Sequence, residues 1–232
     1  MSYLIVVAHP DDEVLGAGGT IYKLAQSGLE VNLCVLSGKA QARAYRPSDG
    51  ELESDMNESC SLLGINKIFE GDFPNIKLNT VPHLELVQFI ENAILQTKAQ
   101  VIITHHPADV NNDHVQTSQA CQAAIRLFQR RVEVTPVSEL WYMEILSSTE
   151  WGVDAALMPY HPNVYVELGK QALKKKIEAL SMYRGVMREY PHPRSKETLE
   201  ALAVFRGSQS GCQYAESFQC AFRRVTDVKR IF

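Results

Sequence analysis

Several features that would assign the chain to a particular class of protein are absent from its sequence. In its 232 residues no run approaches about 18 uninterrupted apolar residues, which excludes a membrane-spanning helix. The first residues enter an apolar run without a charged flank, so no signal peptide is visible. With 23 Lys and Arg against 27 Asp and Glu, the net charge of -4 offers neither a basic surface for nucleic acid nor a polybasic membrane anchor. These absences favour a cytoplasmic protein that acts on small molecules.

Cysteine is scarce and follows no recognisable pattern. The five cysteines show no C-x-x-C spacing and mostly lie in apolar or helical stretches, which predicts buried thiols. No repeat, low-complexity tract or long charge run marks a linker. With 45% hydrophobic residues the chain can bury a sizeable core, so one domain over residues 1–232 is the simplest organisation.

Strand-like and helix-like segments alternate along most of the chain. The predicted strands are Tyr3–Ala8, Val31–Leu36, Lys67–Phe69, Val101–Thr104, Glu139–Glu144 and Val164–Glu167. The predicted helices are Ala17–Ser27, Glu51–Leu63, Val81–Gln96, Val115–Gln129 and Gly169–Tyr183. Residues 37–49 and 151–163 are predicted as loops. This alternation predicts an α/β fold with right-handed crossovers and a mostly parallel central sheet.

Ionisable residues are concentrated where two of these strands end. His9-Pro10-Asp11-Asp12-Glu13 directly follows the first strand, and His105-His106-Pro107-Ala108-Asp109-Val110-Asn111-Asn112-Asp113-His114 follows the fourth. Because parallel strands end at one edge of a sheet, the two clusters can meet in space. Buried carboxylates repel one another and lose hydration, and a divalent cation would offset both effects.

His9, Asp12 and His114 form a two-histidine, one-carboxylate set suited to a catalytic zinc ion, with a fourth position left for water. Asp11 would then serve as the general base that takes a proton from that water. Asp113 is predicted either to orient an imidazole or to cap a helix. Hydrolysis of an amide or ester follows from this arrangement.

Gly16, Gly18 and Gly19 follow the first strand but miss the G-x-G-x-x-G spacing of a dinucleotide site, so they are interpreted as close-packing residues. His105 and His106 are adjacent at a strand end and therefore face opposite sides of the sheet, so at most one should approach the site. Neither is assigned as a ligand. A two-metal phosphoesterase that uses them with Asp11 and Asp12 is an alternative hypothesis.

These motifs, together with Tyr214-Ala215-Glu216-Ser217-Phe218, make the chain resemble the zinc-dependent de-N-acetylases of the PIG-L/LmbE family, essentially from end to end. The resemblance implies a Rossmann-like three-layer sandwich and one Zn²⁺ per chain, with His9, Asp12 and His114 as ligands and Asp11 as base. The implied reaction removes acetyl from an N-acetylglucosamine-type amino sugar or its conjugate. A protein that keeps the metal and binds sugar without turnover is the other alternative.

The resemblance also suggests residues that would contact the substrate. Some members carry a histidine three positions before the last ligand, where this chain has Asn111, which can donate a neutral hydrogen bond to an oxyanion. His192 would then be the best candidate acid, with a protonated Asp11 as the alternative. Some members supply such a histidine across a subunit boundary, and a catalytic His192 donated by a neighbouring copy would require a homo-oligomer. Arg43 and Arg46 lie where members place an arginine against the substrate.

Overall fold

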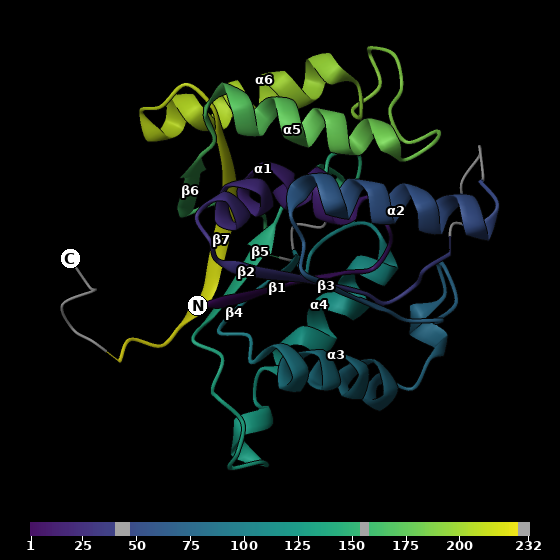
Figure 1. The fold of residues 1–232 in the computed structure, drawn as a ribbon, viewed down its shortest axis with the longest axis vertical. Coiled ribbons are helices and arrows are strands. Elements are labelled where there is room, and N and C mark those ends of the chain that lie inside the picture. The colour runs from purple at the N-terminus through teal and green to yellow at the C-terminus, as the bar shows by residue number, and fades with distance from the viewer. Residues whose placement is uncertain (40–46, 154–157, 227–232) are drawn as a thin grey trace.

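Buried apolar strands form the central sheet of the computed structural model, which describes residues 1–39, 47–153 and 158–226 (Figure 1). The strands are β1 (Ser2–Val7), β2 (Glu30–Val35), β3 (Lys67–Glu70), β4 (Val101–His105), β5 (Glu139–Met143), β6 (Val164–Glu167) and β7 (Ala215–Arg223). Their order across the sheet is β3-β2-β1-β4-β5-β7-β6. The first five pair in parallel, and β7 runs antiparallel to both of its neighbours. The predicted α/β fold with a mostly parallel sheet is confirmed.

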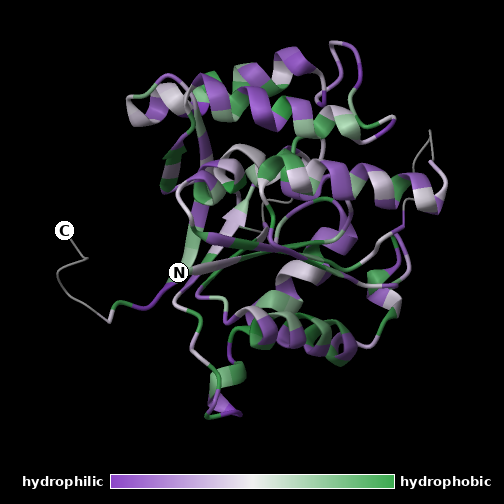
Figure 2. Cartoon of the chain, viewed as in Figure 1, coloured by the Kyte–Doolittle hydropathy of each residue, from purple (hydrophilic) through white to green (hydrophobic). Residues whose placement is uncertain are grey.

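Helices flank this sheet on both sides. Figure 1 shows α1 (Asp12–Gln26), α2 (Asp49–Leu63), α5 (Gly169–Met182) and α6 (Lys196–Ser210) on one side, and α3 (His83–Thr97) and α4 (Asn112–Ala124) on the other. Three short 3₁₀ helices complete the described elements, at Leu78–Thr80, Leu127–Gln129 and Thr149–Trp151. Hydrophilic and hydrophobic residues are interspersed along most of these helices (Figure 2), while α1 is buried on all sides from Asp12 to Tyr22.

The strand β1 contributes to both halves of the hydrophobic core because its side chains alternate across the sheet. Ile5 and Val7 pack into the core beneath α1, α2 and α5. Leu4 and Val6 pack into the core with α3 and α4. This two-sided burial explains why the strand reads as a continuous apolar run in the sequence.

The glycines of α1 permit close packing, as the sequence predicted. A Cβ atom at Gly16 would lie 2.4 Å from Sδ of Met143, and one at Gly19 would lie 2.8 Å from the Leu168 side chain. The helix therefore approaches β5 and the start of α5 more closely than any larger residue would allow. This proximity brings the first turn of α1 against the end of the sheet.

The C-terminal part of the chain differs most from the prediction. Sequence patterns indicated neither α6 nor β7, and the structure shows both, with β7 inserted antiparallel between β5 and β6. The predicted helix over 115–129 is α4 followed by a separate 3₁₀ turn, and α4 begins at Asn112 because the Asn111 side chain accepts the N–H of Asp113. None of the helices in the described ranges is long and apolar enough to cross a bilayer.

Candidate metal centre

The two ionisable clusters meet at the carboxyl ends of β1 and β4, which are neighbours in the sheet. The chain leaves β1 through α1 toward β2 on one side, while β4 pairs on the other side of β1. This is the point at which strand order reverses, where open α/β sheets bind their ligands. His9 and Asp12 come from the turn into α1, and His114 comes from the first turn of α4.

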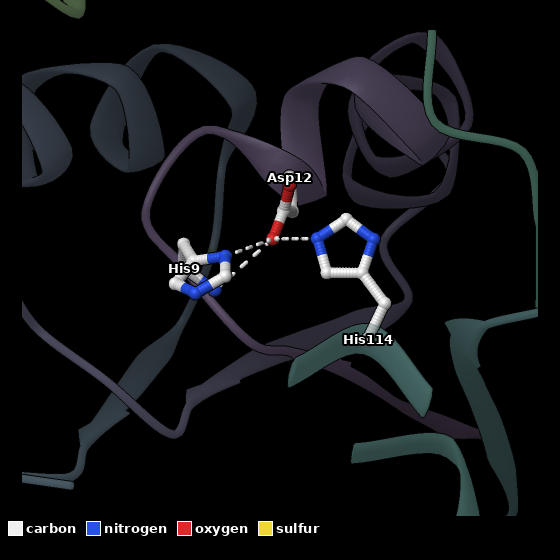
Figure 3. Close-up of side chains that lie close together, drawn as sticks. All are labelled: His9, Asp12 and His114. Carbon is white, nitrogen blue, oxygen red and sulfur yellow. Dashed lines mark hydrogen bonds and ion pairs between the residues drawn. The ribbon is translucent and has the colours of Figure 1, made fainter. Parts of the chain in front are cut away.

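His9, Asp12 and His114 form a group whose ligand atoms all lie within 4.8 Å of one another. Oδ2 of Asp12 lies 3.3 Å from Nδ1 of His9 and 3.3 Å from Nε2 of His114, and it also accepts the backbone N–H of His9. Figure 3 shows the carboxylate between the two rings. All three residues are buried. The structure thus brings together the three ligands predicted from the sequence.

The outer nitrogen of each imidazole is held by a second carboxylate. Nε2 of His9 lies 3.0 Å from Oδ2 of Asp113, and Nδ1 of His114 lies 3.2 Å from Oδ2 of Asp109. Such contacts fix the ring orientation and leave the other nitrogen to face the ligand group. Nδ1 of His9 and Nε2 of His114 are therefore the atoms available to a metal.

Asp109 has a role that the sequence reasoning did not assign. Its carboxylate accepts hydrogen bonds from the hydroxyl groups of Ser148 and Thr149 and from the N–H of Asn111, all of which fix its contact with His114. Ser148 and Thr149 lie beyond β5, about 40 residues away in sequence. A buried histidine that binds a metal needs a carboxylate partner for its other nitrogen, and Asp109 follows the same strand as His114. This requirement could have identified Asp109 from the sequence.

The donor set fits a metal such as zinc. Nε2 of His114 is buried and meets no hydrogen-bond criterion within the described residues, so its 3.3 Å contact with Oδ2 of Asp12 leaves it short of a well-formed partner, although buried polar atoms are nearly always satisfied. Two imidazole nitrogens and one carboxylate oxygen are typical of a catalytic zinc site. The site therefore has the composition, the burial and an unsatisfied ligand atom that metal binding requires.

Neighbouring charged groups at the site shift one another's pKa values. Burial alone would lower the pKa of His114, but the carboxylates of Asp12 and Asp109 overcome this effect and raise it to about 10. Burial would raise the pKa of Asp109, yet hydrogen bonds from His114 and Ser148 lower it to about 2. Burial likewise opposes the charge of Asp12, whose pKa is nevertheless held well below its usual range by His114 and His9. The carboxylates therefore remain ionised and ready to neutralise a cation.

Asp11, the predicted base, lies beside the ligands in a constrained backbone conformation. It is the residue before α1 and has a φ of 102°, which is uncommon for a residue other than glycine. Its N–H donates to Oε2 of Glu13, whose other oxygen accepts the hydroxyl of Tyr183. Its carboxylate oxygen Oδ2 lies 3.2 Å from Nη1 of Arg194.

His105 and His106 divide between the two sides of the sheet as predicted. The ring of His105 stacks on His114 with centroids 3.8 Å apart, and its Nε2 accepts the N–H of Ala8. Burial lowers the pKa of His105 to about 3, so this ring is neutral. His106 instead packs edge-on against Tyr142 and Tyr160.

Two of the remaining predicted residues, Asn111 and His192, lie in the described part of the chain. Asn111 uses its Oδ1 to cap α4, which leaves its amide nitrogen to donate. Nδ1 of His192 accepts the N–H of Arg194, and no hydrogen bond in the described ranges joins His192 to the ligand group. Arg43 and Arg46 lie outside the described residues.

Comparison with known proteins places this site in a family. The model of the family described as PIG-L, GlcNAc-PI de-N-acetylase, matches residues 4–125, which include both ligand clusters. A diacetylchitobiose deacetylase of Thermococcus kodakarensis is 23% identical over 93% of this chain and 81% of its own length.

Solved structures share the fold over the whole chain. A conserved protein of Thermus thermophilus matches 98% of each chain with a TM-score of 0.78 and 25% identity. An N,N'-diacetylchitobiose deacetylase of Pyrococcus horikoshii matches all of this chain and 88% of its own, with a TM-score of 0.74 and 19% identity.

Proposed function

The chain belongs to the PIG-L family and is a deacetylase of that family, and from this membership we propose that it is a zinc-dependent hydrolase of the N-acetyl group of an amino sugar. The proposed substrate carries an N-acetylglucosamine-type unit, free or in a conjugate, and the products are acetate and a free amine. One zinc ion per chain is proposed to bind His9, Asp12 and His114.

The convergence of the three ligand atoms within 4.8 Å, next to Asp11, carries this proposal. A site for metal binding alone needs no further carboxylate at its edge. Asp11 lies one residue from the ligand Asp12 and is held in a left-handed conformation by its surroundings. Strained backbone of this kind is concentrated at functional sites.

Asp11 performs the proton transfers of the proposed reaction. A bound zinc ion would supply Lewis acidity to the acetyl carbonyl and to the attacking water. Asp11 takes one proton from that water as its oxygen bonds to the acetyl carbon. The carbon–nitrogen bond then breaks, the nitrogen receives the proton from Asp11, and acetic acid leaves with the second proton of the water, which it loses to solvent to give acetate.

Two neighbouring side chains are proposed to support the developing negative charge on the acetyl oxygen. The amide nitrogen of Asn111 can donate a hydrogen bond to it from the start of α4. His192 is the second candidate, but partial burial and the nearby cations of Arg188 and Arg194 lower its pKa. His192 is therefore mostly neutral at neutral pH, which favours Asp11 over His192 as the proton donor to the amine.

The substrate class is inferred from the relatives and from the chemistry of the flanking loops. The relatives from Thermococcus and Pyrococcus are named as deacetylases of diacetylchitobiose, an N-acetylglucosamine disaccharide. Arg43 and Arg46, which follow β2 in the sequence, are proposed to bind sugar hydroxyl groups or an anionic part of the conjugate. Their guanidinium groups suit either partner because they donate several hydrogen bonds in a fixed plane.

A two-metal phosphoesterase finds less support. Among the described residues, the one group of His, Cys, Asp and Glu ligand atoms close enough to hold a metal ion is His9, Asp12 and His114. His105 is already bonded to the backbone of Ala8, and His106 faces two tyrosines. Metal content separates the proposals, since a deacetylase of the proposed kind binds about one zinc per chain.

An acetate-release screen tests the proposed function. Zinc-loaded protein is incubated with N-acetylglucosamine, its oligosaccharides, its nucleotide-linked forms and its glycosides, and free acetate and amine are measured together. We expect equimolar release of both from at least one of these substrates. Absence of release from all of them would contradict the proposal.

A further inference from the structure

Arg194 is held in a well-defined turn that the proposed reaction has not yet used. It lies between α5 and α6, one residue before Ser195, whose hydroxyl accepts the N–H of Thr198 and caps α6. Its own N–H donates to Nδ1 of His192. Both contacts fix the backbone from which the guanidinium group extends.

The guanidinium group joins two segments at the edge of the site. Its Nη1 lies 3.2 Å from Oδ2 of Asp11, and its Nε donates to the hydroxyl of Ser147 at 2.9 Å. The Asp11 side chain is 3% exposed and that of Arg194 is 24% exposed. The ion pair is therefore largely shielded from water, which strengthens it relative to a surface pair.

Both partners of Arg194 have unusual backbone conformations. Asp11 has a φ of 102° and Ser147 a φ of 73°, and neither is glycine. Such conformations persist only where surrounding contacts maintain them. Ser147 is further held by its N–H, which donates to Oε1 of Glu150. The contacts of Arg194 thus connect two strained residues that lie 136 positions apart, at the ends of β1 and β5.

We propose that Arg194 is a positioning residue that holds the Asp11 carboxylate in its reactive orientation, with Ser147 holding the guanidinium group in turn. This inference rests on the proposed function, because it assigns a role relative to the base. A guanidinium group suits the task since it stays charged at every pH at which the protein folds and presents several donors in one plane. A carboxylate without this contact would sample other rotamers, and fewer enzyme molecules would have it in place to accept the proton.

The variant Arg194→Met tests this role by separating kcat from KM. Methionine keeps much of the apolar stem but removes the donors, so we expect kcat to fall about 10- to 100-fold while KM changes less than about twofold. Guanidinium chloride at low, non-denaturing concentration should restore part of the lost kcat. Arg194→Lys should retain more activity than Arg194→Met because it keeps a charge near Asp11.

Two further variants provide controls. Ser147→Gly removes the hydroxyl group but adopts a φ of 73° without strain, so it should lower kcat less than Arg194→Met does. Arg184→Ala removes a neighbouring arginine that pairs with Glu51 and Asp55 instead of the site, so kcat should be unchanged. Zinc content should match wild type in Arg194→Met, and the thermal midpoint should fall by no more than about 5 °C, as expected for loss of a single shielded ion pair.

The outcomes separate this inference from its alternatives. An unchanged kcat in Arg194→Met would overturn it, and so would a raised KM with normal kcat, which would make Arg194 a substrate-binding residue. Parallel loss of activity, zinc content and thermal midpoint would assign it a structural role only, and would also overturn it.

A measurement without turnover distinguishes failure of this inference from failure of the proposed function. If the wild-type protein releases no acetate, a double-mutant cycle of Asp11→Asn and Arg194→Met on urea unfolding of the metal-free protein still tests the contact. We expect a coupling of about three- to tenfold in the unfolding equilibrium constant. Additive effects of the two substitutions would overturn the inference whatever the enzyme activity.

Discussion

The two candidate ligand histidines, His9 and His114, each bond a carboxylate through the nitrogen that faces away from the candidate metal position. Asp113 holds Nε2 of His9 and also accepts the N–H groups of Ile76 and Leu78, so it is itself fixed from three directions. This arrangement fixes the orientation of each ring and determines which of its nitrogens faces the candidate metal position. The orientation of the two rings is therefore fixed by Asp113 and Asp109, which do not belong to the candidate ligand set.

Asp113→Asn tests the importance of this support. The amide keeps the shape of the side chain but removes the negative charge that faces His9, so we expect zinc affinity to fall about 10- to 100-fold. Competition with a coloured chelator measures that affinity. Affinity equal to that of wild type would show that Asp113 serves only to accept the N–H groups of Ile76 and Leu78.

Asp11→Asn separates catalysis from metal binding. Asparagine cannot take a proton from water, so kcat should fall at least about 100-fold, while zinc content stays at about one ion per chain. Acetate release and metal analysis of the same preparation provide both values. Unchanged kcat would refute the assignment of Asp11 as base.

The position of helix α1 depends on a buried ion pair as well as on its glycines. Nζ of Lys176 lies 2.7 Å from Oε1 of Glu216 and donates to the carbonyl of Leu15. Glu216 in turn accepts the N–H groups of Gly19 and Thr20. Lys176 of α5 and Glu216 of β7 therefore both bond the backbone of α1 and tie this helix to α5 and to the sheet.

Lys176→Met should destabilise the protein because it leaves the Glu216 carboxylate buried without its cation. We expect a loss of about 3 kcal/mol in the free energy of unfolding, measured with urea. Lys174→Met, an exposed change on the same helix, should alter it by less than about 0.5 kcal/mol. Similar values for both variants would show that the ion pair makes no net contribution.

Elements with strong periodic patterns could be predicted from the sequence, and weaker ones could not. The strands β1 and β4 are buried on both faces, so their apolar runs were clear. Helix α6 was missed because Val204 and Phe205 are exposed and blur its apolar face. The strand β7 was missed because its second half is exposed and its partners lie far away in sequence.

The same distinction applies to the site as a whole. His9, Asp12 and His114 could be predicted because the parallel strand ends bring their two short motifs together. The contact of Asp11 with Arg194 could not, because 183 residues separate them and the contact depends on how α5 and α6 pack. Local patterns thus predicted which residues form the candidate ligand set, and tertiary packing decided which residues surround it.

The stability of the whole protein depends on pH through one buried carboxyl group, that of Glu13. Burial raises the pKa of Glu13 from 4.5 to about 8. The folded state therefore binds this proton more tightly than the unfolded state does, which stabilises folding fully below about pH 4.5. That contribution is lost progressively as the pH rises toward 8, and the free energy of unfolding falls with it.

Glu13→Gln removes this pH dependence because glutamine stays neutral. The thermal midpoints of metal-free Glu13→Gln and metal-free wild type are compared at pH 6 and at pH 9. Relative to wild type, the midpoint of the variant should be about 5 °C higher at pH 9 than it is at pH 6. Calorimetry at the two pH values gives the comparison. A difference that stays constant with pH would mean that Glu13 does not change its charge over this range.

Anomalous diffraction from crystals of the zinc-loaded protein, collected on both sides of the zinc absorption edge, tests the metal centre most directly. We predict one peak per chain, about 2.0 to 2.1 Å from Nδ1 of His9 and Nε2 of His114 and about 2.0 to 2.2 Å from a carboxylate oxygen of Asp12. A peak elsewhere, two peaks per chain, or none at this position would contradict a single zinc ion held by these three residues.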